Sequence, residues 1–201
     1  MASNGTHTRA LFGGSFSMIL PPHAIDVSEI REIPDNQEVF LHSDTDQSII
    51  VELLEYQSQV PDEEAVRYHF DDVTTINGAS DDEGTEVLSV EAVGRQLAAL
   101  QEMSSAWLLA GRQHVAKFNE QARNTVNVHL VLFRLPQYVT DILVTFNDPI
   151  LISPHSSSSS STAACPSQPR GSTGRPTQHW TLDQFRAAAH SLRLLDPAIF
   201  A

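Results

Sequence analysis

Carboxylates and side-chain amides gather in two short polar stretches and along the apolar run that follows them. The first stretch is residues 35–38, and the second contains Asp46 and Gln47, just ahead of the run at 48–56. The side chains concerned are Asp35, Asn36, Gln37, Glu38, Asp46, Gln47, Glu52 and Glu55. Groups of these types attract basic surfaces and form hydrogen bonds with a partner's backbone. They indicate a binding surface.

The acidic residues are concentrated in one part of the chain. Residues 26–91 hold nineteen acidic and two basic side chains, a local net charge of −17. The remaining residues hold six acids and ten bases, a net charge of +4, which together give the −13 of the whole chain. Such a field attracts basic proteins and repels phosphate backbones. We therefore expect a basic protein partner and no direct contact with nucleic acid.

The sequence lacks the motifs of metal sites, nucleotide-binding loops and disulfides. Asp44 and Asp46 do not continue into a calcium loop, which needs further oxygen ligands and a bidentate Glu. The nine histidines show no His-Glu-x-x-His spacing, and neither glycine-rich phosphate loop occurs. The single cysteine, Cys165, excludes an internal disulfide and a cysteine-based zinc cluster. We expect no cofactor, no metal and no conventional enzyme activity, with His69 packed or capped.

The acidic stretches lie beside two predicted strands. Strands are expected at 39–41 and 48–56, separated by a polar loop at 42–47. Glu52 and Glu55 have opposite strand parity, so one of them faces away from any single partner surface. Residues 34–37, Pro-Asp-Asn-Gln, are also a standard turn sequence, and composition alone favours that interpretation.

The other elements predict a sheet with helices. A helical turn capped by Asp26 precedes a helix that begins at Pro61 and ends at 77–78. Thr181 and Gln184 form a capping box at the start of a C-terminal helix over 181–195. Short turns favour antiparallel pairing. Strands are expected around a glycine bend at 13–14 and at 87–90, 107–118, 125–133 and 139–146, while 92–103 is left open between a loop and a short helix. We expect the C-terminal helix to cover one sheet face and the helix at 61–76 to pack elsewhere.

Composition indicates a single domain over 10–201. A flexible N-terminus is expected at 1–9, and a flexible linker at 148–178, which holds five prolines and six consecutive serines. No apolar run approaches the roughly 20 residues that a membrane span needs. The first residues do not form a secretory signal, which favours the nucleus and cytoplasm.

Several sequence blocks occur in an order that matches a known family. The blocks are residues 11–14 (LFGG), 24–28 (AIDVS), 34–40 (PDNQEVF), 45–48 (TDQS), 51–55 (VELLE), 65–72 (AVRYHFDD), 134–138 (RLPQY) and 145–147 (TFN). Together they resemble the Ran guanine nucleotide release factors, the Mog-type Ran-binding proteins. The resemblance covers 11–147 and, more loosely, 180–200.

The resemblance implies a fold, a partner and an activity. The fold is similar to the PsbP-like α/β/α sandwich, with a central, mainly antiparallel sheet flanked by helices. The partner is the small GTPase Ran, whose guanine nucleotide is released in the course of nuclear transport. An alternative is an adaptor role, because vertebrate relatives are linked to cell-surface delivery of a cardiac sodium channel. We expect a monomer in either case.

Nucleotide release requires no covalent chemistry by this chain. A protein that binds the nucleotide-free GTPase more tightly than the loaded one lowers nucleotide affinity by linkage. Lysine, Mg²⁺ and backbone amides hold the nucleotide phosphates. Carboxylates on a strand edge could compete for that lysine or for the metal, and Asn36 and Gln37 could bind switch-region backbone. The resemblance thus turns the preference at 34–37 from a turn to a Ran-binding site.

Overall fold

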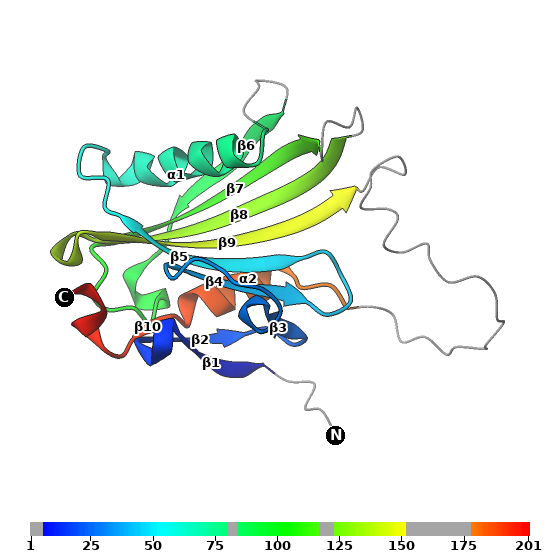
Figure 1. The fold of residues 1–201 in the computed structure, drawn as a ribbon. Coiled ribbons are helices and arrows are strands. Elements are labelled where there is room, and N and C mark those ends of the chain that lie inside the picture. The colour runs from blue at the N-terminus through cyan, green and yellow to red at the C-terminus, as the bar shows by residue number, and fades with distance from the viewer. Residues whose placement is uncertain (1–5, 80–83, 117–122, 152–177) are drawn as a thin grey trace.

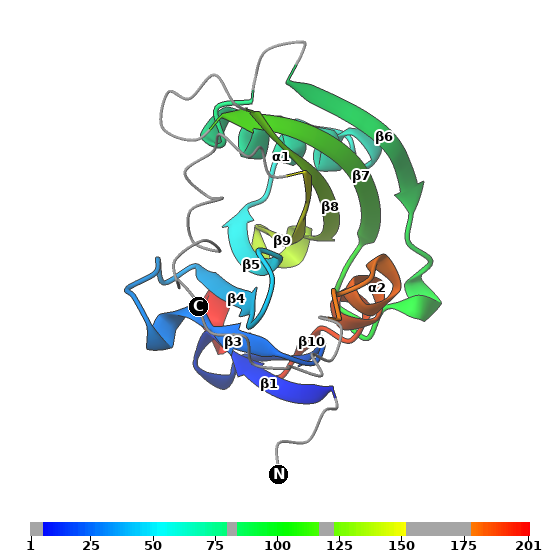
Figure 2. The same ribbon diagram turned by 90° about the vertical axis from the view of Figure 1, so that its right-hand side faces the viewer.

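The protein, described by a computed structural model over residues 6–79, 84–116, 123–151 and 178–201, is built on two antiparallel sheets (Figure 1). The main sheet has seven strands in the order β3-β4-β5-β9-β8-β7-β6. Their bounds are β3 Ala24–Asp26, β4 Gln37–His42, β5 Ser48–Glu55, β6 Thr85–Ala92, β7 Ser105–Ala116, β8 Arg123–Leu135 and β9 Thr140–Leu151. The smaller sheet is formed by β1 His7–Leu11, β2 Phe16–Leu20 and β10 Arg193–Leu194. Figure 2 shows the main sheet as a strongly curved surface, with β3 and β6 at its edges.

The C-terminal helix covers one face of the main sheet, as predicted, and the helix at 61–76 covers the opposite face, as the family resemblance implied. Helix α1 (Asp62–Ile76) packs on β7 and β8 through a cluster that includes Val66 and Phe70. Helix α2 (Leu182–His190) and the small sheet contribute to the larger cluster on the other face, which includes Phe146 and Phe185. Strands β8 and β9 contribute side chains to both clusters, because successive strand residues point to opposite faces. The mixed α/β architecture with mainly antiparallel sheets is therefore confirmed.

Local sequence signals explain how both helices begin and end. Helix α1 follows Pro61, carries three acidic residues in its first turn and ends before Gly78, whose φ is 68°. Helix α2 has the predicted capping box between Thr181 and Gln184. It ends at His190, earlier than the predicted 195, because the chain leaves the helix to bury Leu192 and to pair β10 with β2. Neither helix is long and apolar enough to cross a membrane.

Pairing with a neighbouring strand moves two predicted boundaries. Strand β1 begins at His7, inside the segment 1–9 that was expected to be loose, because β1 pairs with β2. Strand β9 continues to Leu151 along β8, so the linker expected from 148 cannot begin before 152. The rest of the predicted linker, 152–177 with Cys165, lies outside the described residues. In the open stretch 92–103 there is a single 3₁₀ turn, Arg95–Leu97.

Candidate partner-binding surface

The β4–β5 hairpin positions the eight predicted site residues, but it divides them between its two ends. Gln37 pairs with Glu52 near one end, and Leu41 pairs with Ser48 near the turn at the other. Strand β4 has six residues, which at the usual rise per residue separates the two ends of the hairpin by about 20 Å. Six of the residues lie together at the end away from the turn, and we call this group the hairpin base: Asp35, Asn36, Gln37, Glu38, Glu52 and Glu55. Asp46 and Gln47 lie at the turn.

Two residues of the hairpin base form a pair on the α1 side of the sheet. Gln37 Nε2 donates a hydrogen bond of 2.7 Å to Glu52 Oε1. Glu52 is opposite Leu143, which belongs to the α1 cluster, so Glu52 lies on that face. Burial raises the pKa of the Glu52 carboxyl, and the hydrogen bond from Gln37 partly offsets this effect. Glu55, at the exposed end of β5, has the opposite parity, as predicted.

Residues 34–37 do form a turn, and that turn presents a carboxylate. The N–H of Gln37 donates to the carbonyl of Pro34, at 3.0 Å. Asn36 holds the turn against β5, because its Nδ2 donates to the Leu53 carbonyl and its own carbonyl accepts from the Leu53 N–H. Asp35 is left exposed at the apex. The turn and the binding interpretations are therefore compatible, with Asn36 committed to structure and Asp35 available to a partner.

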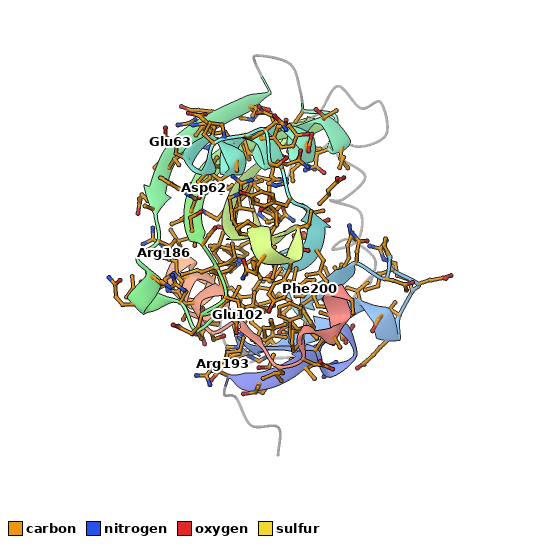
Figure 3. All side chains as sticks on the ribbon, turned by 90° about the vertical axis from the view of Figure 1, so that its left-hand side faces the viewer. Asp62, Glu63, Glu102, Arg186, Arg193 and Phe200 are labelled. Atoms are coloured by element: carbon orange, nitrogen blue, oxygen red, sulfur yellow. The ribbon has the colours of Figure 1, made fainter. Side chains whose placement is uncertain are left out.

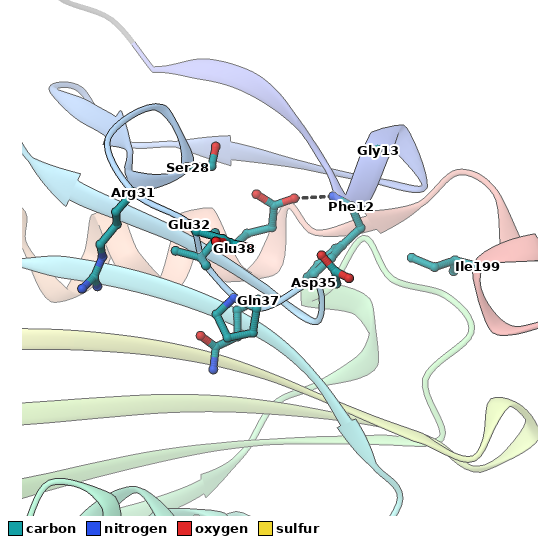
Figure 4. Close-up of a pocket in the computed structure, with 11 residues that line it drawn as sticks. Phe12, Gly13, Ser28, Arg31, Glu32, Asp35, Gln37, Glu38 and Ile199 are labelled. Carbon is teal, nitrogen blue, oxygen red and sulfur yellow. Dashed lines mark hydrogen bonds between the residues drawn. The ribbon is translucent and has the colours of Figure 1, made fainter.

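Glu38 lies on the other face of β4 and lines a pocket of about 470 Å³ (Figure 4). Its Oε1 accepts a hydrogen bond from the backbone N–H of Phe12. Burial raises the pKa of the Glu38 carboxyl, and the Phe12 hydrogen bond opposes that shift. The other lining residues of this pocket include Phe12, Pro34, Asp35 and Ile199. The pocket thus places this carboxylate beside both apolar and polar side chains, from segments far apart in the sequence.

A second pocket adjoins Glu55. It has a volume of about 380 Å³, is lined by Glu55, Val139 and Phe200, and shares Ile199 with the first pocket. Val139 is 65% exposed and adopts a φ of 50°. That conformation is costly for a β-branched residue, and such strain is common at binding sites. The one sequence signal near Val139 was the block at 134–138 that resembles the family.

Gln47 is not available to a partner, contrary to the prediction. The residue is 1% exposed. Its Nε2 donates to Asp148 Oδ1 at 2.8 Å and to the Trp180 carbonyl at 2.9 Å, and its Oε1 accepts from the Trp180 N–H at 2.7 Å. Gln47 therefore anchors the segment that leads into α2. Asp46 beside it is exposed but is remote from the hairpin base.

The same end of the hairpin holds a buried histidine. The Asp44 N–H donates to His42 Nδ1 at 3.0 Å, which leaves His42 Nε2 to donate to the Gln178 carbonyl at 2.9 Å. These two contacts require the neutral ring with its proton on Nε2. Burial lowers the pKa of His42, which favours the same neutral form. His42 and Gln47 thus both connect the hairpin turn to the start of α2.

A buried charge network fixes the chain between β5 and α1, and the sequence did not reveal it. Arg134 is fully buried, with its Nε 3.2 Å from Asp141 Oδ1 and its Nη1 2.7 Å from Asp62 Oδ1. Asp141 Oδ2 lies 3.1 Å from Nε2 of His69, which is packed as expected. In Figure 3, Asp62 lies on the inner side of α1 and Glu63 on its outer side. An arginine within the apolar run of β8 was the one available signal.

The network also holds the loop that leaves Glu55. Arg134 donates to the carbonyls of Gln57 and Val60, and its guanidinium lies 4.2 Å from the centre of the Tyr56 ring. The Tyr56 N–H donates to the Val139 carbonyl. These contacts therefore hold the backbone on both sides of the second pocket. Within the described ranges, no group of three His, Cys, Asp or Glu side chains is arranged to hold a metal ion.

Comparison with known proteins places this chain in a family. The family described as "Ran-interacting Mog1 protein" matches residues 9–149. The "Ran guanine nucleotide release factor" of Danio rerio is 55% identical over 194 residues, which cover 96% of this chain and 99% of that protein. The "Nuclear import protein MOG1" of Saccharomyces cerevisiae is 31% identical over 151 residues, which cover 70% of this chain and 65% of that protein.

A solved structure has the same fold. The crystal structure of the Saccharomyces cerevisiae Ran-binding protein Mog1p matches with a TM-score of 0.66 at 24% identity, covering 99% of this chain and 100% of that one. The sequence match extends over more than half of the chain and includes β3, β4, β5 and the buried network. The chain belongs to the family of Ran-interacting Mog1 proteins.

Proposed function

We propose that this protein binds the small GTPase Ran and promotes release of its guanine nucleotide, and that it thereby regulates nuclear protein transport. It acts as a monomer in the nucleus and cytoplasm, as a regulator that catalyses no covalent reaction. Support comes from a relative of nearly equal length that is named for nucleotide release and from a yeast relative that is named for nuclear import. The part of the chain that would carry this activity is the hairpin base.

One observation carries the proposal: the hairpin base presents carboxylates on a backbone that is already held in place. Asp35 and Glu55 are exposed, and Glu38 and Glu52 are half-buried at their sides. The turn contacts of Asn36 and the Arg134 network hold both ends of this surface. Binding therefore orders little of the chain, and more of the interaction energy is available to the complex.

The charge of this surface explains how binding could loosen a nucleotide. The phosphates of a bound nucleotide are held by a lysine, by Mg²⁺ and by backbone amides. A carboxylate that pairs with that lysine, or with the metal, does so best when the phosphates have left. The hairpin base would then bind nucleotide-free Ran most tightly, and by linkage its binding lowers nucleotide affinity.

The test is dissociation of fluorescent GDP and GTP analogues from Ran, with and without the protein. We expect acceleration by the wild type and a loss of at least about tenfold in Ran affinity, about 1.4 kcal/mol, for the Asp35→Lys, Glu55→Lys double variant. The matched control is Asp71→Lys, Asp72→Lys, which makes the same charge change at exposed positions of α1. Equal losses of Ran affinity in both variants would assign the effect to the overall negative charge of the protein. If the wild type did not accelerate nucleotide dissociation, the proposal would be overturned.

The adaptor alternative predicts a different result in the same assay. Escort of a sodium-channel cytoplasmic segment also calls for a basic partner, so the acidic surface alone does not separate the two functions. An adaptor of that kind would leave nucleotide dissociation from Ran unchanged. Pull-down of Ran and of a channel segment by the same charge-reversed variant, at low and high salt, separates the two partners.

A further inference from the structure

The pocket beside Glu38 combines an apolar wall with carboxylates. Three segments form it: the 3₁₀ turn Phe12–Gly14, the segment 28–38 that leads into β4, and the C-terminal 3₁₀ turn Pro197–Phe200. Phe12, Pro34 and Ile199 supply apolar surface, while Glu32, Asp35 and Glu38 supply negative charge. Figure 4 shows Arg31, the basic residue of the lining, extending away from the Glu38 carboxylate.

Glu38 has no positively charged partner of its own among the described residues. Arg9, whose charge influences Glu38, is itself paired with Asp26 at 2.9 Å and with Glu29 at 3.2 Å. The Phe12 N–H engages only Oε1 of the Glu38 carboxylate, so Oε2 remains for a ligand. A half-buried carboxylate without a counter-charge is unfavourable, and a cation that enters the pocket would relieve that cost.

We propose that this pocket receives a single lysine or arginine side chain of Ran, with its cationic head paired to Glu38 and Asp35. The inference rests on the proposed function and adds the chemistry of one contact. A long basic side chain suits the recess because its aliphatic stem packs on apolar surface while its head reaches a carboxylate. Phe12, Pro34 and Ile199 would contact the stem. The acid-rich composition of 26–91 gives the charge complementarity that guides such a side chain to the pocket.

Glu38→Gln tests the inference, because the substitution removes the charge and retains the shape. The amide oxygen of the substituted side chain can still accept from the Phe12 N–H, so the turn at 12–14 keeps its contact. We expect roughly tenfold weaker Ran binding, mostly through faster dissociation, together with a weaker salt dependence. The control is Glu63→Gln, at an exposed position on the outer side of α1, which should bind Ran as the wild type does.

A second measurement reads the pocket without Ran. The Phe12 amide resonance reports on Glu38 directly, since that N–H donates to the carboxylate. We expect N-acetyl-lysine amide and N-acetyl-arginine amide to shift this resonance in the wild type and not in Glu38→Gln. N-acetyl-norleucine amide, which has the stem without the charge, should shift it less. An equal shift by norleucine would overturn the cationic occupant in favour of an apolar one.

The outcomes separate the pocket from the function. If the wild type accelerates nucleotide release and Glu38→Gln binds Ran equally well, the inference is overturned and the proposed function stands. If the wild type neither binds Ran nor accelerates release, the proposed function fails, and with it the assignment of the occupant to Ran, whatever the Phe12 resonance does. Weaker Ran binding by a folded Glu38→Gln, with Glu63→Gln unchanged, supports both.

Discussion

Two groups of acidic residues lie close together in this molecule, and they differ in whether their side chains have positively charged partners. In the buried network, Asp141 accepts from Arg134, His69 and the Gln57 N–H, and Asp62 pairs with the same arginine. At the hairpin base, the contacts of Glu38 and Glu52 are one backbone N–H and one amide, neither of them charged. Acids that look alike in the sequence therefore differ in whether the fold supplies a counter-charge. The acids that have a counter-charge stabilise the fold, and we expect the acids without one to bind a partner.

The two groups are connected through the loop after β5. Glu55 ends that strand, and Tyr56 follows it against the Arg134 guanidinium. The network thus determines where the last carboxylate of the hairpin base can lie. A binding surface that is supported by a rigid layer beneath it needs little rearrangement on binding. This dependence predicts that a substitution in the Arg134 network also disturbs the proposed binding surface at the hairpin base. Substitutions at the hairpin base should leave the network intact.

The largest effect is expected from Asp141→Asn. The amide replaces an acceptor oxygen and removes the charge opposite Arg134, which leaves a buried guanidinium short of a partner. Breaking a buried ion pair in this way costs about 3–5 kcal/mol of unfolding free energy. Urea denaturation measures it, with Asp35→Asn, the same substitution at an exposed position, expected within about 0.5 kcal/mol of the wild type. Similar costs for the two variants would contradict the distinction between the groups.

Gln47→Ala comes next, and it tests whether a predicted site residue is structural. The substitution leaves the Trp180 N–H and carbonyl without their side-chain partner in a buried position. Unsatisfied buried groups cost about 1–3 kcal/mol, so we expect that loss in urea denaturation and faster hydrogen exchange at the Trp180 amide. Asn36→Ala, which removes one exposed hydrogen bond, is the control and should cost less. Intact stability with reduced Ran affinity would restore Gln47 to the binding surface.

The contacts of Gln47 show which parts of the site were visible in the sequence. The Thr181 capping box and the turn at 34–37 could be predicted because their partners lie within three residues of each other. The partner of Gln47, Trp180, lies 133 residues further along the chain. No local pattern distinguishes a glutamine that binds a returning segment from one that faces solvent.

The partners of Arg134 were also hidden from the sequence, although an arginine in an apolar strand is itself a noticeable feature. Its partner Asp62 is 72 residues away, in the first turn of the helix predicted from Pro61. A lone arginine in the apolar run of β8 indicates a buried ion pair, but it does not say with which acid. The ends of β1 and β9 are a different case, because they are ordered by pairing with the neighbouring strands β2 and β8 and not by their own composition. Short-range chemistry was predictable from this sequence, and long-range pairing was not.

The smallest effect on stability is expected from Glu52→Gln, and its sign separates binding from folding. Burial raises the pKa of Glu52, so the folded state holds its proton more readily than the unfolded chain does. Stability from this group is therefore present below the ordinary glutamate pKa and declines as the pH rises through the folded value. The variant has no charge to bury there and keeps an oxygen that accepts from Gln37. We expect an unchanged or slightly higher melting temperature at neutral pH, with a flatter pH dependence above the ordinary pKa.

The same variant should bind Ran less well, because Glu52 belongs to the hairpin base. A protein that gains stability when it loses a binding carboxylate carries that carboxylate for function. The measurements are thermal unfolding across the acid-to-neutral range and a Ran titration, with Glu63→Gln as the control in both. If Glu52→Gln lowered the melting temperature and left Ran affinity intact, Glu52 would belong with Asp141 among the structural acids. The boundary between the two groups would then pass through the hairpin base itself, between Glu52 on the α1 side and Glu38 on the other face.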